Sequence, residues 1–245
     1  MTPRHALAAA TALLALMTAG PLNATEIHFV TETYPPFNFM DQQTLKGSSV
    51  DQIKLIMKDS GIGYSMEIMP WARALALATT QEDYCVFTTV HNAERDARFK
   101  WVEPLLKSRT LLIRKTGSQA APKTLDEAKE FIVGTQRDDF TQDILQDNHF
   151  PKIDIATDLG LTMKKLMSGR IDLMPISDKY YEKLKRDGAS IEAVLTLAES
   201  TYSIACNKSV PDKAIDLMQQ GLDKIIADGT QDRLFEAYGL SKDTQ

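Results

Sequence analysis

The chain has 245 residues, of which 43% are hydrophobic, and its 28 lysines and arginines stand against 33 aspartates and glutamates, a net charge of −5. A net acidic chain without a dense tract of lysine and arginine is a poor binder of nucleic acids or anionic membrane surfaces. The length fits one large domain or two lobes of about 100 residues, each able to bury its own core.

The first 24 residues have the order of a secretory signal peptide. Arg4 precedes an apolar run over residues 6–19, Gly20 and Pro21 interrupt it, and Ala24 supplies a small residue at its end. A membrane anchor is the alternative, but a spanning helix needs about 20 apolar residues. We therefore expect export to the periplasm with cleavage after Ala24. The mature chain then keeps 27 basic and 33 acidic side chains, a net charge of −6.

Strand and helix patterns alternate along the first half of the remaining chain. Pro35 and Pro36 indicate a loop, because consecutive prolines remove backbone donors and restrict the residues before them. Alternating or continuous apolar runs predict strands at 26–31, 64–69 and 84–87, and apolar residues at helical spacing predict helices from 49 to about 61 and at 71–79.

The second half repeats this alternation. Thr124 and Glu127 have the spacing of a capping box after a Gly/Ser/Pro linker. Further strands are expected at 111–113, 131–134, 153–156, 171–176 and 202–206, and helices at 140–145, 159–167, 212–228 and 231–238. Strands that alternate with helices indicate an α/β fold with largely parallel sheets.

Two segments of the chain share one pattern. ALALATTQEDYCVFTTV and LTMKKLMSGRIDLMPIS each read as an amphipathic helix, a short turn, an aspartate (Asp83 or Asp172) and an apolar strand that ends in hydroxyl residues. Two similar units suggest two similar lobes, and the crevice between lobes is a natural ligand site.

Common catalytic and metal-binding motifs are missing from the sequence. It contains no GxxxxGK, GxGxxG, GxSxG, HExxH or CxxC, and the three histidines after the leader, His28, His91 and His149, do not have metal-ligand spacing. Nucleotide, zinc and thiol chemistries are therefore disfavoured, and we expect no cofactor and no metal. An enzyme that uses carboxylates alone stays open.

The two cysteines, Cys85 and Cys206, lie 121 positions apart in apolar strand-like runs. A disulfide is permitted outside the cytoplasm. Buried free cysteines, which behave as small hydrophobic residues, are the simpler interpretation. We therefore expect two unpaired thiols.

Seven stretches after the leader together carry a family resemblance. In order, they are TETYPPFNF, GSSVDQIKLIMKDSG, MPWARALALATTQEDYCVF, TTVHNAERDARFKWVEPL, FIVGTQRDDFTQDIL, LMSGRIDLMPISD and IADGTQDRLFEAYGL. In their order and spacing they resemble the periplasmic binding proteins for polar amino acids, which have the two-lobed type II fold and serve ABC importers. The likeness extends over nearly the whole chain after the leader and does not depend on one segment.

The resemblance implies an α/β fold of two Rossmann-like lobes joined by a hinge of crossover strands. After the signal peptide at 1–24, lobe one is expected to comprise residues 25–107 plus 211–245, and lobe two residues 108–210. The crossover strands are expected near Ser108–Lys115 and Thr201–Lys208.

The resemblance also implies roles for side chains. Tyr34 would stack on the ligand, because a rigid aromatic ring gives a large contact area at small entropic cost, unless it only anchors its loop. Arg95 would bind the ligand's α-carboxylate through its planar fork of donors, unless it is a surface arginine. Thr88 and Thr89 would add hydroxyl donors beside it, and Asp178 would pair with the α-amino group.

In lobe two, Arg137, Asp138 and Asp139 occupy the strand-to-helix turn whose backbone donors would meet the carboxylate. The complete set of expected ligand-binding residues is Tyr34, Trp71, Thr88, Thr89, Arg95, Arg137, Asp138, Asp139 and Asp178.

The chain departs from the family pattern at several of these places. Val90 and Asn92 replace an expected serine and threonine, and Ser177 stands where the amino-binding acid is expected. Trp71 and Arg73 belong to a PW-x-R-A segment that either lines the rim of the cleft or simply starts a helix. These departures indicate a divergent branch whose ligand the resemblance does not determine.

The resulting expectation is a monomeric periplasmic protein that captures a small polar solute, an amino acid or related carboxylate, for an ABC permease of the inner membrane, without catalysing a reaction. One alternative is an enzyme similar to cyclohexadienyl dehydratases, with Glu32, Asp138, Asp139 or Asp178 as acid and base. Another is a sensory binding protein that reports to a membrane receptor.

Overall fold

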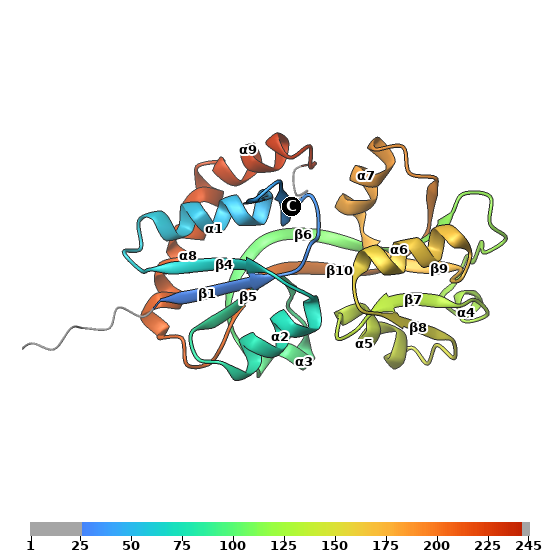
Figure 1. Ribbon diagram of the computed structural model, residues 1–245, viewed down its shortest axis with the longest axis horizontal. Helices are drawn as coiled ribbons and strands as arrows, with labels where there is room; N and C mark the ends of the chain where they lie inside the picture. Colours follow the sequence, from blue (N-terminus) through green and yellow to red (C-terminus); the bar gives the residue numbers. More distant parts are fainter. Residues whose placement is uncertain (1–25, 242–245) are drawn as a thin grey trace, which may run out of the picture.

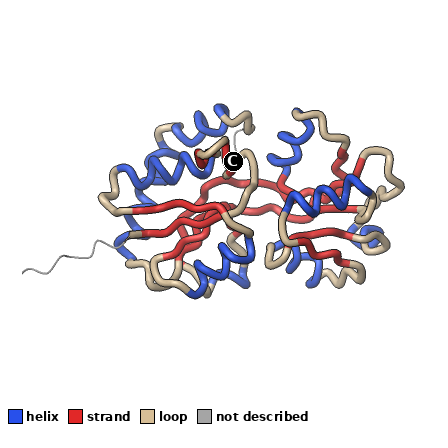
Figure 2. Tube along the Cα trace, in the orientation of Figure 1, coloured by secondary structure: helices blue, strands red, loops and turns tan. Residues whose placement is uncertain are grey.

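The computed structural model describes residues 26–241, so the leader expected at residues 1–24 lies outside the described part of the chain. Figure 1 shows two groups of helices and strands side by side, with two long strands running between them. In Figure 2 the strands form a layer through the middle of both groups, and helices lie above and below it.

The strands of the first group are parallel. β1 (Ile27–Thr31) lies between β4 (Tyr64–Ile68) and β5 (Tyr84–Val90) and pairs with both in parallel. A separate hairpin, β2 (Phe39–Asp41) and β3 (Thr44–Lys46), follows the first strand. The carboxyl ends of β1 and β5 therefore lie at the same edge of the sheet.

The second group contains a similar parallel set. β7 (Val133–Gln136) pairs in parallel with β8 (Ile153–Ala156) and with β9 (Leu173–Ser177). The carboxyl ends of β7 and β9 thus lie together as well.

Two strands of 16 residues each, β6 (Lys100–Lys115) and β10 (Ile191–Cys206), join the groups. They are antiparallel to each other along their length, β10 also pairs with β5, and β6 also pairs with β9. The order of the larger sheet among the described residues is β4-β1-β5-β10-β6-β9-β7-β8. This arrangement confirms the expected α/β fold with crossover strands.

The helices surround both groups of strands. Those of the first group are α1 (Ser48–Lys58), α2 (Trp71–Thr80), α3 (Ala93–Asp96), α8 (Asp212–Ala227) and α9 (Thr230–Ala237). Those of the second group are α4 (Leu125–Ala128), α5 (Phe140–Asp147), α6 (Leu159–Ser168) and α7 (Asp178–Arg186). Within residues 26–241, no helix has the length and apolar character needed to cross a membrane.

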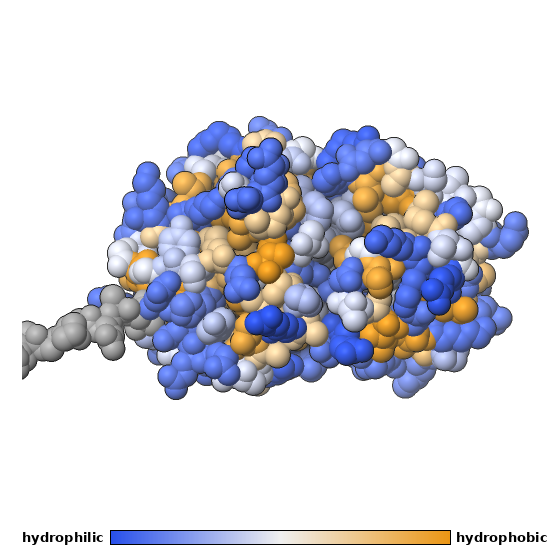
Figure 3. Space-filling view, in the orientation of Figure 1, coloured by the Kyte–Doolittle hydropathy of each residue, from blue (hydrophilic) through white to orange (hydrophobic). Residues whose placement is uncertain are grey.

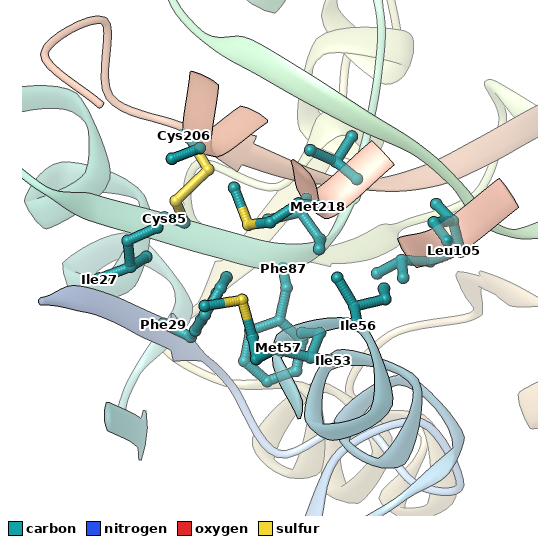
Figure 4. Close-up of a cluster of buried hydrophobic side chains, with 14 of the residues drawn as sticks. Ile27, Phe29, Ile53, Ile56, Met57, Cys85, Phe87, Leu105, Cys206 and Met218 are labelled. Atoms are coloured by element: carbon teal, nitrogen blue, oxygen red, sulfur yellow. A yellow bond between two sulfur atoms is a disulfide. The ribbon is translucent and has the colours of Figure 1, made fainter. Parts of the chain in front are cut away.

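The largest hydrophobic core lies in the first group, where β1 and β5 face α1 and α8. Ile27 and Phe29 of β1, Ile53 of α1, Phe87 of β5 and Met218 of α8 are almost fully buried there (Figure 4). Full burial of an apolar side chain of this size contributes about 1.5–3 kcal/mol. This core fixes the positions of β1 and β5, and with them the loops that follow the carboxyl ends of these strands.

The expectation of two free thiols is wrong, because Cys85 and Cys206 form a disulfide (Figure 4). The prediction assigned the two cysteines to strands of different lobes. The last residues of β10 instead return to the first group and pair with β5, and Cys206 is the direct partner of Cys85 in that pairing. Their Cα atoms are 3.9 Å apart, and both side chains are fully buried.

The loop that carries Tyr34 is held against the start of α1. The backbone N–H of Ser49 donates to the carbonyl of Phe37 at 3.0 Å. Gly47, just before the helix, has a φ of 135°, and a Cβ at this position would lie 2.0 Å from the same carbonyl oxygen. Only glycine fits this close approach of two backbone segments.

Candidate functional site

A pocket lies between the two groups, at the carboxyl ends of their parallel strands. The space between its lining atoms, including the part open to solvent, is about 530 Å³, and both groups contribute its walls. A recess between the two halves is also visible on the face in Figure 3. Crevices at strand carboxyl ends are the usual ligand sites of open α/β sheets.

Arg95 forms one wall of this pocket and is only 2% exposed. It lies in the short helix α3, whose N-cap residue Asn92 accepts a hydrogen bond from the Arg95 N–H at 3.0 Å. Its guanidinium lies over the ring of Trp71, 5.6 Å from the ring centroid. The Nη2 group donates to the carbonyl oxygen of Asp138 at 2.9 Å, across the cleft.

The other terminal nitrogen of Arg95, Nη1, is buried and has no hydrogen-bond partner among the described residues. Burial lowers the pKa of the guanidinium, and the charge of Asp139 opposes this effect. An unpaired buried donor on a charged group costs free energy, and an anionic ligand oxygen would remove this cost.

Trp71, the first residue of α2, also reaches across the cleft. Its Nε1–H donates to the Asp138 carbonyl at 2.8 Å, so this one oxygen accepts from both Trp71 and Arg95. Asp138 has a φ of 58°, in the left-handed region, and this turn directs its carbonyl toward the first group. The Asp138 side chain itself is exposed.

Tyr34 makes a second contact between the groups. Its hydroxyl donates to the Ser177 Oγ at 2.8 Å and accepts from the Ser177 backbone N–H at 3.0 Å. Its ring packs edge-on against Phe37 and Tyr180, each with centroids 5.1 Å apart. Burial raises the pKa of the Tyr34 hydroxyl, so this group stays protonated and available as a donor.

Two carboxyl groups face the pocket. Glu32, one residue beyond β1, accepts a hydrogen bond from the Gln136 amide at 2.7 Å, and burial raises its pKa to about 8. Asp139 is the N-cap of α5 and accepts from the backbone N–H of Thr141 at 2.9 Å and from the hydroxyl of the same residue. Burial also raises the pKa of Asp139, which the Thr141 bonds and the charge of Arg95 oppose.

The pocket thus brings together five of the residues expected from the sequence: Tyr34, Trp71, Thr88, Arg95 and Asp139. Thr88 lies in β5 with a φ of 57° and donates to the side-chain oxygen of Asn38 at 2.7 Å. Asp138 contributes its backbone carbonyl, as described above.

The other expected residues lie elsewhere. Thr89 is fully buried, is not among the residues that line the pocket, and pairs with Ser203 of β10. Arg137 is exposed and does not line the pocket either. Asp178 accepts from the Ser108 hydroxyl at 2.7 Å and from Arg109 Nε at 3.0 Å, and it lines a different, open groove beside β6.

Some pocket residues had no expected binding role. Gln136 and Ser177 end β7 and β9, Phe140 starts α5, and Tyr202 comes from β10. The position directly at the carboxyl end of a predicted strand would have indicated Gln136 and Ser177. The strand pattern contains no comparable signal for Tyr202. In residues 26–241, no group of three or more histidine, cysteine, aspartate or glutamate side chains is arranged to hold a metal ion.

The fold, two groups of strands and helices joined by crossover strands around a cleft, is that of type II periplasmic binding proteins. Residues 27–241 match the bacterial extracellular solute-binding proteins, family 3, and the chain belongs to this family. No curated protein sequence matches the chain significantly.

Solved structures share this fold at low sequence identity. A mutant of the protein ArgBP from T. maritima superposes with a TM-score of 0.79 at 17% identity, over 87% of this chain and 95% of the other. A histidine kinase sensor domain with similarity to periplasmic binding proteins gives 0.79 at 14%, over 86% and 95%. The ancestral amino acid-binding protein AncCDT-1, a precursor of cyclohexadienyl dehydratase, gives 0.76 at 18%, over 87% and 95%.

Proposed function

We propose that the protein is a monomeric periplasmic receptor that binds an amino acid or a related small carboxylate in the cleft and delivers it to an ABC permease. The observation that carries this proposal is Arg95, which presents a buried guanidinium to the pocket between the two groups and whose Nη1 has no partner among the described residues. A carboxylate oxygen fits this donor in both charge and geometry.

The contacts between the two halves supply the binding mechanism. Hydrogen bonds from Tyr34 to Ser177, from Gln136 to Glu32, and from Trp71 and Arg95 to the Asp138 carbonyl all cross the cleft. A ligand held by both walls stabilises this closed arrangement relative to an open one through its higher affinity for the closed state. A permease could then distinguish loaded from empty receptor by shape.

A thermal-shift screen of the mature protein against amino acids, polyamines and small carboxylates tests this proposal. A ligand present at 100 times its dissociation constant adds about 2.7 kcal/mol to the unfolding free energy, which is a clear rise in melting temperature. We expect at least one amino acid or small carboxylate to produce it. A complete panel without a shift would refute the proposal.

The half-buried carboxyl of Glu32 favours one second candidate, an enzyme with the same fold. With its pKa raised to about 8, Glu32 holds a proton at neutral pH and has the property required of a general acid. Incubation with prephenate or arogenate distinguishes the two functions, because a binding protein returns the compound unchanged and a dehydratase releases an aromatic product.

A further inference from the structure

We propose that Glu32 receives the cationic nitrogen of the ligand, in the role that the resemblance assigned to Asp178. This inference rests on the proposed function, because it concerns the same pocket. The ligand class is therefore an ammonium-bearing carboxylate, with its anionic end at Arg95.

The first argument is the position of Asp178. Its two carboxylate oxygens are engaged by Ser108 and Arg109, and it lines the groove beside β6, outside the pocket. An ammonium group inside the pocket must therefore find its counter-charge on another side chain.

The second argument is the state of the two carboxyls that do line the pocket. Asp139 caps α5 through Thr141, and Arg95 lies close enough that its charge favours the ionised form of Asp139. Glu32 lacks such a cation. Its described polar contact in the pocket is the neutral amide of Gln136.

The third argument is electrostatic. The carboxyl of Glu32 is shielded from water, and the negative charges of Asp139 on α5 and Asp158 on α6 act on it. The neutral phenol of Tyr180 on α7 lies within its electrostatic range. The two charges that act most strongly on Glu32 among the described residues, Asp139 and Asp158, are both acidic, so they disfavour its ionised form. A buried carboxylate becomes favourable when a cation pairs with it, and an ammonium ligand supplies that cation.

The nitrogen that Glu32 receives is either the α-ammonium or a side-chain ammonium of the ligand. L-lysine and L-norleucine distinguish the two, because they differ only in the terminal ammonium of the side chain. Their affinities are measured by calorimetry at one pH for the wild type and for Glu32→Gln, which preserves shape and the hydrogen bond to Gln136. If Glu32 receives the side-chain ammonium, lysine binds at least about tenfold more tightly than norleucine, and Glu32→Gln reduces this ratio to below threefold. If Glu32 receives the α-ammonium, the variant weakens both ligands about equally, by tenfold or more.

Controls separate these outcomes from misfolding and from failure of the proposed function. Glu67→Gln, an exposed carboxylate on the neighbouring strand β4, should change neither affinity by more than about twofold. If Glu32→Gln does not fold, Glu32→Asp should retain the lysine preference in reduced form. Unchanged binding of both ligands by Glu32→Gln overturns the inference and leaves the proposed function standing. Absence of lysine and norleucine binding by the wild type also overturns the inference, and the wider screen then decides whether the proposed function fails with it.

Discussion

Replacement of Arg95 by alanine should weaken ligand binding severely. The side chain is 2% exposed, so its contact with a ligand carboxylate is formed away from water. Removing one partner of such a buried charge-assisted pair costs about 2–5 kcal/mol, because the remaining charge stays desolvated. This free energy corresponds to a loss of affinity of about 30-fold to several thousandfold.

The substitution also removes the hydrogen bond from Nη2 to the Asp138 carbonyl, but Trp71 still donates to that oxygen. Most of the loss should therefore come from the ligand contact. Arg95→Lys should recover only part of the affinity, because an ammonium restores the charge but cannot make both the Asp138 bond and the ligand bond with a planar fork.

Isothermal calorimetry with the tightest-binding amino acid from the screen, at low and high salt, measures these effects. Arg98→Ala is the matched control, because the Arg98 side chain is 38% exposed, so its removal should cost less than about 1 kcal/mol and respond to salt. The Arg95 effect should persist in high salt. A change below threefold in both Arg95 variants would remove this residue from the site, together with the main argument for a carboxylate ligand.

Three further outcomes are expected. Denatured, unreduced protein should show no free thiols, and two titratable thiols would contradict the disulfide. Reduction of the Cys85–Cys206 bond, which joins residues 121 positions apart, should lower the unfolding free energy by up to about 5 kcal/mol. Glu32 should make the unfolding free energy fall as the pH rises from 4.5, the ordinary pKa of the group, to about 8, because the folded state retains a proton that the unfolded state loses. The fall should be up to about 1.4 kcal/mol per pH unit. Denaturant titrations that give Glu32→Gln the same pH profile as the wild type would refute this. Tyr34→Phe should weaken ligand binding by about 1–3 kcal/mol, because the backbone N–H of Ser177 loses its acceptor in the closed cleft. The melting temperature of the ligand-free protein should change little. A large drop in that temperature at unchanged affinity would instead support a loop-anchoring role for Tyr34.

Local patterns in the sequence were sufficient for the class of fold. The apolar runs and helical spacings that predicted strands at 26–31 and 84–87 and a helix at 71–79 correspond to β1, β5 and α2. The Thr124 cap is also present, since its hydroxyl accepts from the Glu127 N–H at 3.2 Å. These features depend on residues a few positions apart, which a single sequence contains in full.

The long crossover strands were only partly predicted. The apolar pattern indicated strands at 111–113 and 202–206, and the resemblance placed the crossovers near Ser108–Lys115 and Thr201–Lys208. β6 and β10 each extend over 16 residues. The first part of β10, residues 191–201, has polar residues interspersed among apolar ones, so no long apolar run identifies it as a strand. Its extended form is stabilised by pairing with β6, a contact between segments far apart in the chain.

The order of strands and helices was therefore sufficient to predict the α/β fold, and the family resemblance at the segments around Tyr34, Arg95 and Asp139 indicated pocket residues from both groups. Three features were decided only by the tertiary structure: the disulfide, the turning of Asp178 toward Ser108 and Arg109, and the placement of Glu32 opposite Gln136. Each depends on which strand lies beside which and on the face that a side chain presents there. Such long-range pairings are set by the packing of the whole chain, and the residues that flank each position in the sequence do not specify them.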